Sequence, residues 1–539
     1  MTTVLRTTWT KLIGTSSNER ATALEIASDG SIYVGGYTYG DLNGETNNGN
    51  MDAFFSKYDS DGNLIWTRLF GNTSDSRLYS IDTASDNSIY ITGKISGDIN
   101  SQTNNGSQDI FLAKYDSNGT IQWTKLVGTS SGDQGRDIKI GSDGFIYISG
   151  FTQGNLNGET LNGGADPFLA KYNSNGVEQW TKLLGDPWAE YSNAIDIDSS
   201  GNIYFTGEDF IAKYNSDGDI GFIQEFPDIN TFYANDILVT SDEKIYITGR
   251  ANGSIDDQES SANDAYIAQY NSNGTRNWTR FIGSTANETG FGLAEGPNNT
   301  VHLTAQALGS IDGHSATGYG EVLIANYSSD GTKNWTDFFG GSGDEQPYSI
   351  ETDSSGNLLL AGYSTADLSE QTNNGLLDGF LTKLSISSDT GDASFAISGT
   401  TQVGQTLSIT ESTADPDGTG TLYYEWQSSL DGITWTKIND GYSHLSYEPT
   451  HVKSSTTAGT TLTPDLADVN GSKSTTSITL NANGSISFSG NYTSLDNEED
   501  PRRSVSAGND FVKIFAGGWA KVAAQRTDGS LLVMGYSTD

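Results

Sequence analysis

The chain has 539 residues, of which 28 are Lys or Arg and 68 are Asp or Glu, so its formal net charge is −40. Such an excess of carboxylates repels nucleic acid and anionic lipid headgroups, which excludes the usual nucleic-acid binders. The sequence contains no Cys, which excludes disulfides, thiolate metal sites and Cys nucleophiles. No apolar run approaches the roughly 18 to 20 residues that cross a bilayer, so we expect no membrane insertion.

A motif of the form Trp-Thr-x-x-x-Gly recurs along the first two thirds of the chain. It begins at Trp9, Trp66, Trp123, Trp180, Trp278 and Trp335. The spacing is 57 residues except for one gap of 98, in which Phe222 occupies the Trp position of a degenerate copy. The unit that starts at Trp180 is therefore predicted to have lost a loop. A repeat of this length is typical of solenoids and propellers.

Each unit contains four short runs rich in Ile, Tyr, Phe, Trp and Thr, which we name strands A to D. In the second unit these runs are YSIDTASD, NSIYITGK, DIFLAKYD and TIQWTKLVG. Asp-Gly and Asn-Gly turns of hairpin size join A to B and C to D, so neighbouring strands are predicted to be antiparallel. Four antiparallel strands in every 40 to 57 residues indicate the blade of a β-propeller.

The number of blades follows from the strand sets. Seven A–B–C sets occur, but the first D motif, Trp9–Gly14, stands alone before them, and the last C strand, 379–386, has no D strand after it. We therefore predict an all-β fold with a seven-bladed propeller in which the N-terminal strand closes the last blade. Eight blades are the alternative. The recurring Trp is predicted to pack between blades, although a glycan-stacking platform is the other interpretation.

The units AFFSKYDSDGNLIWTRLFG and IFLAKYDSNGTIQWTKLVG, together with DGSIYVGGYT, resemble the bacterial SBBP-type β-propeller repeat. The resemblance extends over about residues 8–386, and the loop LNGETNNGNMDAF is similar to versions common in cyanobacterial secreted proteins. It implies the propeller fold and an extracellular or cell-surface setting, but no single activity. Because the N-terminus lacks a secretory apolar region, we expect export without an N-terminal signal peptide.

The repeat pattern ends near residue 388, which predicts three parts: a propeller over 1–388, a second domain over 389–450 and a C-terminal segment over 451–539. Strand-like runs and a central Trp426 make the second part resemble a bacterial Ig-like β-sandwich. The third part is interpreted as β-rich or partly disordered, and as an incomplete module. Its last run distantly resembles the repeat of the regulator of chromosome condensation family.

The connections between strands differ in length between the two faces of the predicted propeller. The A–B and C–D turns are nearly minimal, whereas the B–C loops have about 12 to 15 residues in six of the seven blades. Long loops on a rigid scaffold are the usual place of binding residues. The face formed by the B–C loops and the D–A connections, which we call the B–C face, is therefore the predicted functional face.

Several B–C loops place oxygen-bearing side chains at alternate positions, and Ca²⁺ takes six to eight oxygen ligands. The candidate Ca²⁺ ligands are Asp41, Asn43, Glu45, Asp52, Asp98, Asn100, Asp109, Asp367 and Asp378. The loops lack the Gly and the final bidentate Glu of the 12-residue calcium loop. The alternative is that Asn-Asn-Gly forms a turn and the last Asp caps strand C. Ca²⁺ is the one cofactor that the sequence suggests.

Three further residues do not follow the repeat. Trp188, in a D–A loop, and His314, in a B–C loop, are predicted ligand contacts. His302 is in a strand B where other blades have Tyr, so we expect it to be a core substitution.

We predict a non-catalytic binding, adhesion or scaffold module of a bacterial surface or exported protein, which contacts a protein or glycan ligand. One alternative is an enzyme that uses the central channel, such as a glycan lyase or a lactonase-like hydrolase. Another is a purely structural repeat segment of a larger protein. The A-strand segments show mainly Ile or Leu with alternating acids and no cluster of His, Arg or Glu, which favours binding over chemistry. These segments are ALEIAS, SIDTAS, DIKIGS, AIDIDS, DILVTS, GLAEGP and SIETDS.

Overall fold

The computed structural model divides the chain into two compact units, Met1–Ser388 and Asp389–Asp539. In the first unit it describes residues 3–388 except 186–190, 227–230, 257, 261, 315–318 and 370. In the second unit it describes only short strands between residues 394 and 534.

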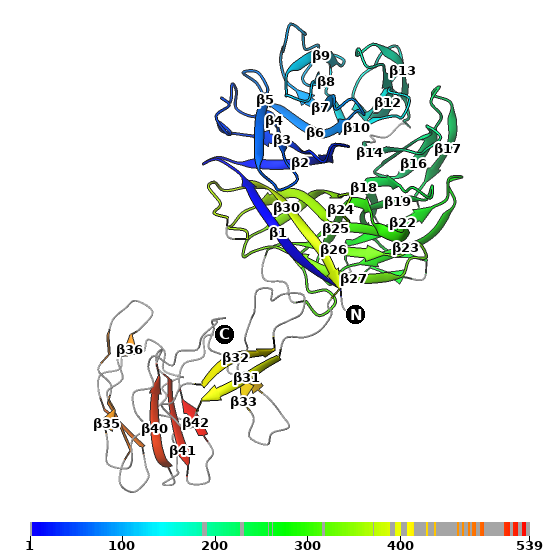
Figure 1. The fold of residues 1–539 in the computed structure, drawn as a ribbon. Helices are drawn as coiled ribbons and strands as arrows, with labels where there is room; N and C mark the ends of the chain where they lie inside the picture. The colour runs from blue at the N-terminus through cyan, green and yellow to red at the C-terminus, as the bar shows by residue number, and fades with distance from the viewer. Residues whose placement is uncertain are drawn as a thin grey trace. The chain divides into compact units, whose positions relative to one another are not determined.

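The first unit is a ring of seven four-stranded antiparallel sheets, as predicted (Figure 1). Blades 1 to 3 comprise β2 (Glu19–Ile26), β3 (Ile32–Thr38), β4 (Asp52–Tyr58) and β5 (Leu64–Phe70); β6 (Ser76–Thr83), β7 (Ile89–Ile95), β8 (Asp109–Tyr115) and β9 (Ile121–Val127); and β10 (Asp133–Ile140), β11 (Ile146–Thr152), β12 (Asp166–Tyr172) and β13 (Glu178–Leu183). Blades 4 and 5 comprise β14 (Ser192–Ile197), β15 (Ile203–Gly207), β16 (Phe210–Tyr214) and β17 (Ile220–Glu225); and β18 (Thr231–Val239), β19 (Ile245–Asn252), β22 (Asp264–Tyr270) and β23 (Arg276–Ile282). Blade 6 comprises β24 (Glu288–Glu295), β25 (Val301–Ala307), β26 (Glu321–Tyr327) and β27 (Lys333–Phe339).

The last blade joins the two ends of the repeat region. It comprises β28 (Glu345–Thr352), β29 (Leu358–Ser364), β30 (Asp378–Ser388) and, as its outer strand, β1 (Thr3–Ile13). β1 pairs with β30 in antiparallel register from Thr3 opposite Ser388 to Ile13 opposite Gly379. The predicted closure by the N-terminal strand is therefore confirmed. It covers a sheet edge that would otherwise be open to other chains.

Blade 4 has lost its B–C loop, as the shortened repeat predicts. Only residues 208–209 connect β15 to β16. The B–C loop of blade 5 contains a small hairpin, β20 (Ser254–Ile255) with β21 (Gln258–Glu259). A 3-10 turn, η1 (Pro297–Asn299), joins β24 to β25 in blade 6.

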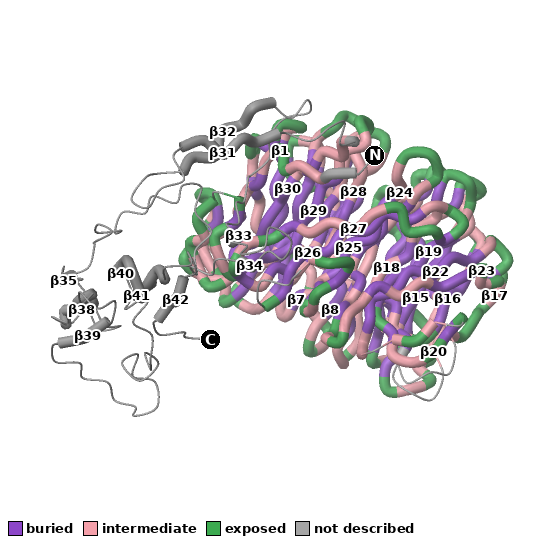
Figure 2. The backbone as a smooth tube through the Cα atoms, turned by 90° about the horizontal axis from the view of Figure 1, so that it is seen from below, coloured by how far each residue is buried: buried purple, intermediate pink, exposed green. Residues whose placement is uncertain are grey.

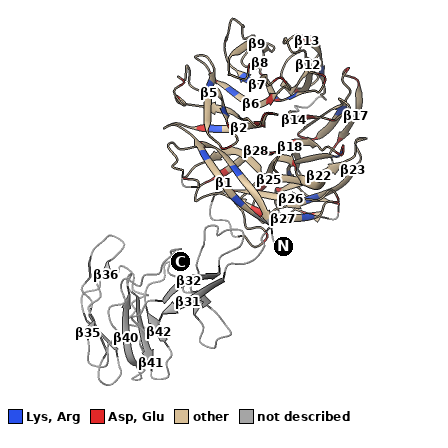
Figure 3. Cartoon of the chain, in the orientation of Figure 1, with Lys and Arg blue, Asp and Glu red and all other residues tan. Residues whose placement is uncertain are grey.

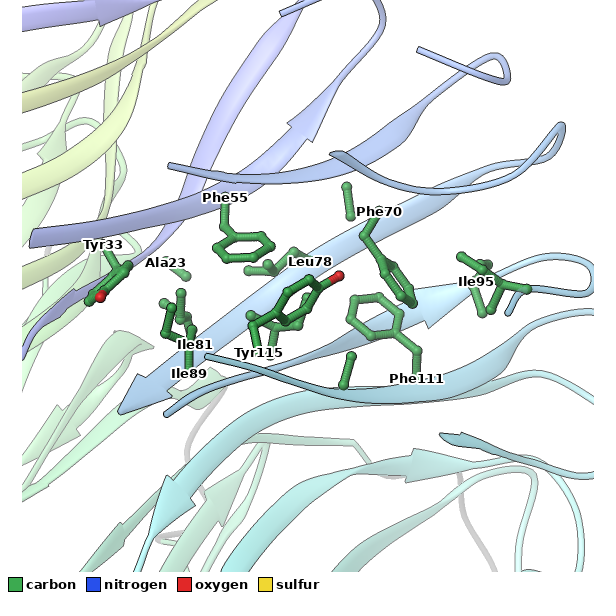
Figure 4. Close-up of a cluster of buried hydrophobic side chains, with 14 of the residues drawn as sticks. Ala23, Tyr33, Phe55, Phe70, Leu78, Ile81, Ile89, Ile95, Phe111 and Tyr115 are labelled. Carbon is green, nitrogen blue, oxygen red and sulfur yellow. The ribbon is translucent and has the colours of Figure 1, made fainter. Parts of the chain in front are cut away.

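The core lies between adjacent blades. The middle strands β22 and β26 are buried along their whole length, whereas the outer strand β17 is exposed except for one half-buried position (Figure 2). Between blades 1 and 2, side chains from both sheets form one cluster, in which Phe70 packs on Phe111 with ring centroids 4.6 Å apart (Figure 4). Such contacts hold neighbouring sheets face to face.

The recurring Trp packs between blades, as predicted. Trp66 packs against the cluster between blades 1 and 2 and makes an edge contact with Phe55 at a centroid distance of 5.3 Å. A Cβ built on Gly119, in the C–D turn of the next blade, would lie 3.2 Å from the Trp66 ring. Glycine at this turn leaves room for the indole, and its positive φ of 74° suits a residue without a side chain.

The described strands of the second unit form small antiparallel sheets. They are β31 (Ser394–Gly399) with β32 (Leu407–Thr413); β33 (Gln427–Ser428) with β34 (Thr436–Lys437); β35 (Thr461–Leu462), β38 (Ser477–Leu480) and β39 (Ile486–Ser489); β36 (Leu466–Ala467) with β37 (Lys473–Ser474); and β40 (Phe511–Gly517), β41 (Lys521–Arg526) and β42 (Leu531–Met534). Most of this unit lies outside the described residues, so the Ig-like sandwich and the incomplete module stay predictions.

Candidate functional site: the mouth of the central channel

A polar cavity of about 410 Å³ lies in the centre of the ring, where residues of the seven A strands line it. In each A–B pairing the register shifts by one residue, which marks a β-bulge in all seven A strands. A bulge redirects a side chain away from the regular alternation of a strand. The seven bulge residues all line the cavity, and we call them the mouth ring: Thr22, Tyr79, Arg136, Asn193, Asn235, Phe291 and Tyr348.

The mouth ring lies on the side of the predicted functional face. Each A strand begins at a D–A connection, and its first residues pair with the end of strand B, next to the B–C loop; Glu19 opposite Thr38 is an example. The bulge residues follow shortly after this point, so they lie nearer the B–C face than the residues further along the A strands. At these positions the blades differ, whereas the position two residues further along each A strand is Leu or Ile in every blade.

A second layer of the channel, further from the B–C face, contains carboxylates. We call Glu25, Asp82, Asp137, Asp196, Asp236 and Glu351 the carboxylate ring; except for Asp82, all of them line the cavity. Four of these side chains link one blade to the next. Asp137 accepts a hydrogen bond at 2.8 Å from the backbone N–H of Ile138 on its own strand, and another at 2.8 Å from that of Ile195 in the next blade.

The same bridge occurs at Asp82, Asp196 and Asp236. The alternating acids of the A strands therefore have a structural role, because they satisfy backbone donors on both sides of each blade junction.

Lys139 is the cation among these carboxylates. Burial on its own would lower the pKa of Lys139, but Asp196, Asp82 and Asp137 hold this pKa well above its ordinary value. Burial also raises the pKa of Glu351 to about 7, although Lys139 acts against this rise. The sequence analysis expected alternating acids in the A strands but no cluster of His, Arg or Glu. Glu25, Glu351 and Arg136 all line the same cavity, so the expectation of no such cluster is wrong. The segments considered did contain Glu25 and Lys139, but a sequence does not show that they converge.

Basic residues border the mouth ring on the side of blades 1 to 3. We call Arg20, Arg77, Lys94 and Arg136 the cationic band. Arg136 is also a mouth-ring residue and lines the cavity, whereas the other three lie beside the cavity lining. Figure 3 marks basic residues blue and acidic residues red, and both occur along the inner strands β2 and β6. Lys94 lies directly opposite Arg77 in the pairing of β7 with β6.

Aromatic rings alternate with the guanidinium groups of the band. The central carbon of the Arg20 guanidinium lies 4.5 Å from the ring centroid of Tyr363, and that of Arg77 lies 4.8 Å from the centroid of Tyr37. Arg136 lies 4.7 Å from the ring centroid of Tyr79. These are distances at which a cation is attracted to the face of an aromatic ring.

Tyrosines of the mouth ring also touch the band directly. Arg20 donates a hydrogen bond of 2.8 Å from Nη1 to the hydroxyl of Tyr348. A side-chain hydrogen bond with Tyr79 contributes to the raised pKa of Arg77, although burial acts against this rise. These contacts join the band and the mouth ring into one surface that runs from blade 7 to blade 3.

The band is electrostatically positive in a strongly negative chain. Burial, together with the charges of Arg77 and Arg136, lowers the pKa of Lys94 to about 8, while Asp75 acts in the opposite direction. A lysine pKa lowered in this way is a sign of a crowded positive site.

The predicted calcium ligands of the first B–C loop have hydrogen-bond partners within the propeller. Asp41 and Asp52 accept hydrogen bonds of 2.9 and 2.8 Å from backbone N–H groups of the same loop. Asn43 donates a 3.0 Å hydrogen bond to a threonine hydroxyl of strand β5, and Glu45 pairs with Arg68 at 3.3 Å. These contacts support the alternative of a self-capped turn.

The other loops repeat these bonds. The residues that do so are Asp98, Asn100, Asp109, Asp367 and Asp378. Among the residues that the structure describes, no group of three or more His, Cys, Asp or Glu side chains is placed to hold a metal ion. Ca²⁺ binding at this rim stays a prediction.

The two predicted ligand contacts have different outcomes. His314 is half-exposed, stacks on Phe338 at a centroid distance of 3.8 Å and contacts the Glu321 carboxylate at 2.7 Å. Its role as a ligand contact stays a prediction. Trp188 lies outside the described residues. His302 is 1% exposed, and burial lowers its pKa to about 4, so its assignment to the core is confirmed.

The residues of the cationic band were missed by the sequence analysis. Arg20, Arg77 and Arg136 precede the A-strand segments that were compared, and Lys94 ends a strand B. A signal was present, because three consecutive units have Arg at or near the start of strand A. Which of these side chains face the channel depends on the bulge, and the repeat spacing does not show it.

Comparisons with known proteins agree with the repeat. Residues 179–208 match the SBBP family, described as "Beta-propeller repeat". A segment of 217 residues is 29% identical to "Regulatory protein FlaEY" of Caulobacter vibrioides and covers 36% of this chain and 22% of that protein. A second relative, "Uncharacterized WD repeat-containing protein L264" of Acanthamoeba polyphaga mimivirus, is 23% identical over 187 residues, which are 28% of this chain and 14% of that protein. The chain thus spans about a fifth or less of these curated relatives.

Solved structures are similar at low identity. "Streptogramin B lyase structure" is 15% identical with a TM-score of 0.44, and the match covers 71% of this chain and 98% of that one. The Pan2 WD40 domain of Neurospora crassa is 10% identical with a TM-score of 0.39, over 67% and 88% of the two chains. Neither similarity assigns an activity to this chain. Among the described residues, no helix has the length and apolar character that crossing a membrane requires.

Proposed function

We propose that this protein is a binding module of a bacterial surface or exported protein, and that it holds a protein or glycan ligand at the mouth of its channel. One observation supports this most directly. Seven bulges direct seven side chains of five types into one cavity on the face with the long loops. Its volume of about 410 Å³ falls in the range of about 300 to 1,000 Å³ that is usual for ligand sites.

The variation at the mouth ring supports binding over a purely structural role. A repeat that only builds a scaffold can use the same residue in every blade. Here the bulge position has Thr, Tyr, Arg, Asn or Phe, whereas the position two residues further along strand A is Leu or Ile in every blade. Aromatic, amide and guanidinium groups that converge on one concave site are the usual components of specific recognition.

An enzyme at the same mouth is the competing proposal. Lys94, whose pKa is lowered to about 8, is a group that could accept a proton near neutral pH. The two proposals differ in turnover. Mass spectrometry of a bound glycan before and after incubation with catalytic amounts of the protein separates them, because a binding module leaves the ligand unchanged.

The test of the binding proposal uses variants that narrow the mouth. Asn193→Tyr and Asn235→Tyr introduce a side chain that blades 2 and 7 already have at this position. Asn118→Tyr, at an exposed C–D turn on the opposite face, is the matched control. We expect at least tenfold weaker binding on a glycan array and to immobilised protein ligands for the two mouth variants, and unchanged binding for the control.

Asn193 and Asn235 donate hydrogen bonds of 2.7 and 2.8 Å to the backbone carbonyls of Ala234 and Gly290 in the next blade. Because Tyr removes these bonds, we expect the mouth variants to melt at a lower temperature than the control, and binding is compared at a temperature at which all three proteins are folded. If the mouth variants bind every ligand as well as the wild type does, the mouth is not the binding site and the proposal fails.

A further inference from the structure

The cationic band lacks the ion pairs that other basic residues of the propeller form. Lys171 pairs with Asp143 at 3.3 Å, Arg276 with Asp256 at 3.0 Å and Lys383 with Asp353 at 2.8 Å. Within the part of the chain that the structure describes, no carboxylate lies within 4.0 Å of the charged nitrogens of the band. Arg250 and Arg280 also lie over aromatic rings with no carboxylate within 4.0 Å among the described residues, so the distinctive feature of the band is that several such cations lie close to one another.

The guanidinium groups are held in place without neutralisation. Tyr37, Tyr79 and Tyr363 contact them through their ring faces, and the Nε atoms of Arg77 and Arg136 are buried with no hydrogen-bond partner in the protein. A buried donor without a partner is costly. Arginines fixed by aromatic faces keep a rigid fork of donors, a geometry that matches carboxylate, sulfate and phosphate groups.

The rest of the cavity limits where an anion can bind. Deeper in the channel the carboxylate ring repels a negative group, and blades 4 to 6 contribute the uncharged Asn193, Asn235 and Phe291 to the mouth ring. A negative group is therefore stable only on the side of blades 1 to 3. The amide and aromatic side chains opposite are suited to the uncharged, hydroxyl-bearing part of the same ligand.

We propose that the channel mouth recognises an anionic saccharide, and that Arg20, Arg77, Lys94 and Arg136 bind its carboxylate or ester sulfate. This proposal rests on the proposed function and specifies its ligand class. The alternative source of the same chemistry is a free inorganic anion, and the two are separated below by their probes.

The central experiment compares three probes by titration calorimetry with the full chain. The probes are an oligoglucuronate, a neutral cello-oligosaccharide of equal length, and inorganic sulfate. We expect the oligoglucuronate to bind at least tenfold more tightly than the neutral oligosaccharide, and its binding to weaken as salt is raised. Sulfate binding as tight as that of the oligoglucuronate would assign the site to free anions and overturn the saccharide proposal.

Variants identify the residues involved. Arg77→Gln and Arg136→Gln should weaken oligoglucuronate binding at least tenfold, whereas Arg77→Lys should retain part of it. The matched control is Arg68→Gln, which removes an arginine that pairs with Glu45 in the first B–C loop. Unchanged binding by both mouth variants, with a melting temperature like that of the wild type, overturns the proposal.

Lys94 provides an independent readout. Its neighbours are Arg77 on β6, Arg136 on β10 and Asp75, and a bound anion would favour the charged form of the lysine. At pH 8 to 8.5, binding should therefore take up protons, which is measured by titration in buffers of different ionisation enthalpy. Lys94→Met should abolish this uptake. If the heat of binding depends on the buffer in the same way for the wild type and for Lys94→Met, a role for this side chain is contradicted.

The outcome separates this inference from the proposed function. If the neutral oligosaccharide binds as well as the charged one and Asn193→Tyr blocks it, the mouth is a binding site but the anionic class is wrong. If neither oligosaccharide nor sulfate binds, the anionic class is also wrong, and the proposed function then depends on the glycan and protein arrays alone.

Discussion

At the level of single residues, the Trp-Thr-x-x-x-Gly motif and the last Asp of the B–C loop explain each other. Gly71 ends the motif of blade 1, and a Cβ built there would overlap the carboxyl group of Asp52. The same contact recurs between Gly128 and Asp109 in blade 2. Each Asp is fully buried, caps a backbone N–H of its loop and packs on the glycine. The cap engages Oδ2 of each Asp, whereas Oδ1 is buried without a hydrogen-bond partner in the protein.

The replacement Gly71→Ala tests this contact. The added methyl group must displace a buried carboxyl group, and overpacking of this kind costs about 1 to 3 kcal/mol. We expect the urea concentration at the midpoint of unfolding to decrease by an amount that corresponds to this loss of free energy. The control is Gly221→Ala in β17, where the new methyl group would meet the flexible side chain of Lys213 at 3.3 Å. An equal midpoint for Gly71→Ala and the wild type would show that the contact is loose.

At the level of elements, the propeller depends on a strand borrowed from the other end of the repeat region. β1 completes the sheet of β28, β29 and β30, and its Thr10 hydroxyl hydrogen-bonds to that of Thr382 at 2.8 Å in the buried part of the pairing. Without β1, the backbone groups of β30 that pair with it would be left unpaired along an exposed edge. Closure should therefore govern both the stability of the ring and its tendency to associate.

Deletion of residues 1–14 removes β1 and tests this dependence. We expect a lower melting temperature together with concentration-dependent association, measured by calorimetry and by light scattering. Deletion of residues 389–539, which form the separate second unit, is the control and should leave the melting of the propeller close to that of the full chain. A monomeric protein with wild-type melting after loss of β1 would contradict the role of closure.

The elements also show what the sequence could and could not reveal. Strand type, blade number and closure follow from a motif that repeats every 57 residues, because hydrophobic periodicity and Asn-Gly turns are local signals. The bulge that turns Arg136 or Tyr79 into the channel is a one-residue irregularity in pairing, and composition does not mark it. Loop length therefore pointed to the face on which the candidate site lies, while the central residues of that site were not identified.

At the level of the whole molecule, the net charge of −40 divides into two kinds of carboxylate. Exposed turn acids such as Asp59 and Asp330 have a lowered pKa, because they accept hydrogen bonds from their own turns. In the channel, burial raises the pKa of Asp82 to about 6 and that of Asp236 to about 7. The scaffold thus holds carboxylates in its centre that are easier to protonate than those of an unfolded chain.

This contrast predicts how stability depends on pH. A carboxyl group whose pKa is higher in the folded state than in the unfolded state binds more protons when the protein is folded. Its contribution to the free energy of unfolding is complete below the unfolded pKa of about 4 and is lost as pH rises through the folded pKa of about 6 to 7. The turn acids act in the opposite direction, and their contribution is lost only at more acidic pH. Melting temperature should therefore be highest near pH 4 to 5 and fall towards pH 8.

Two variants separate the two kinds of carboxylate. Asp236→Asn should flatten the fall in melting temperature towards pH 8. Asp353→Asn should alter the melting temperature only at acidic pH, because bonds to Asn357 and Lys383 lower the pKa of Asp353 in spite of burial. A melting temperature that rises steadily from pH 5 to pH 8 would show that the channel carboxylates are ionised without cost, which would contradict the burial of charge at the centre of the ring.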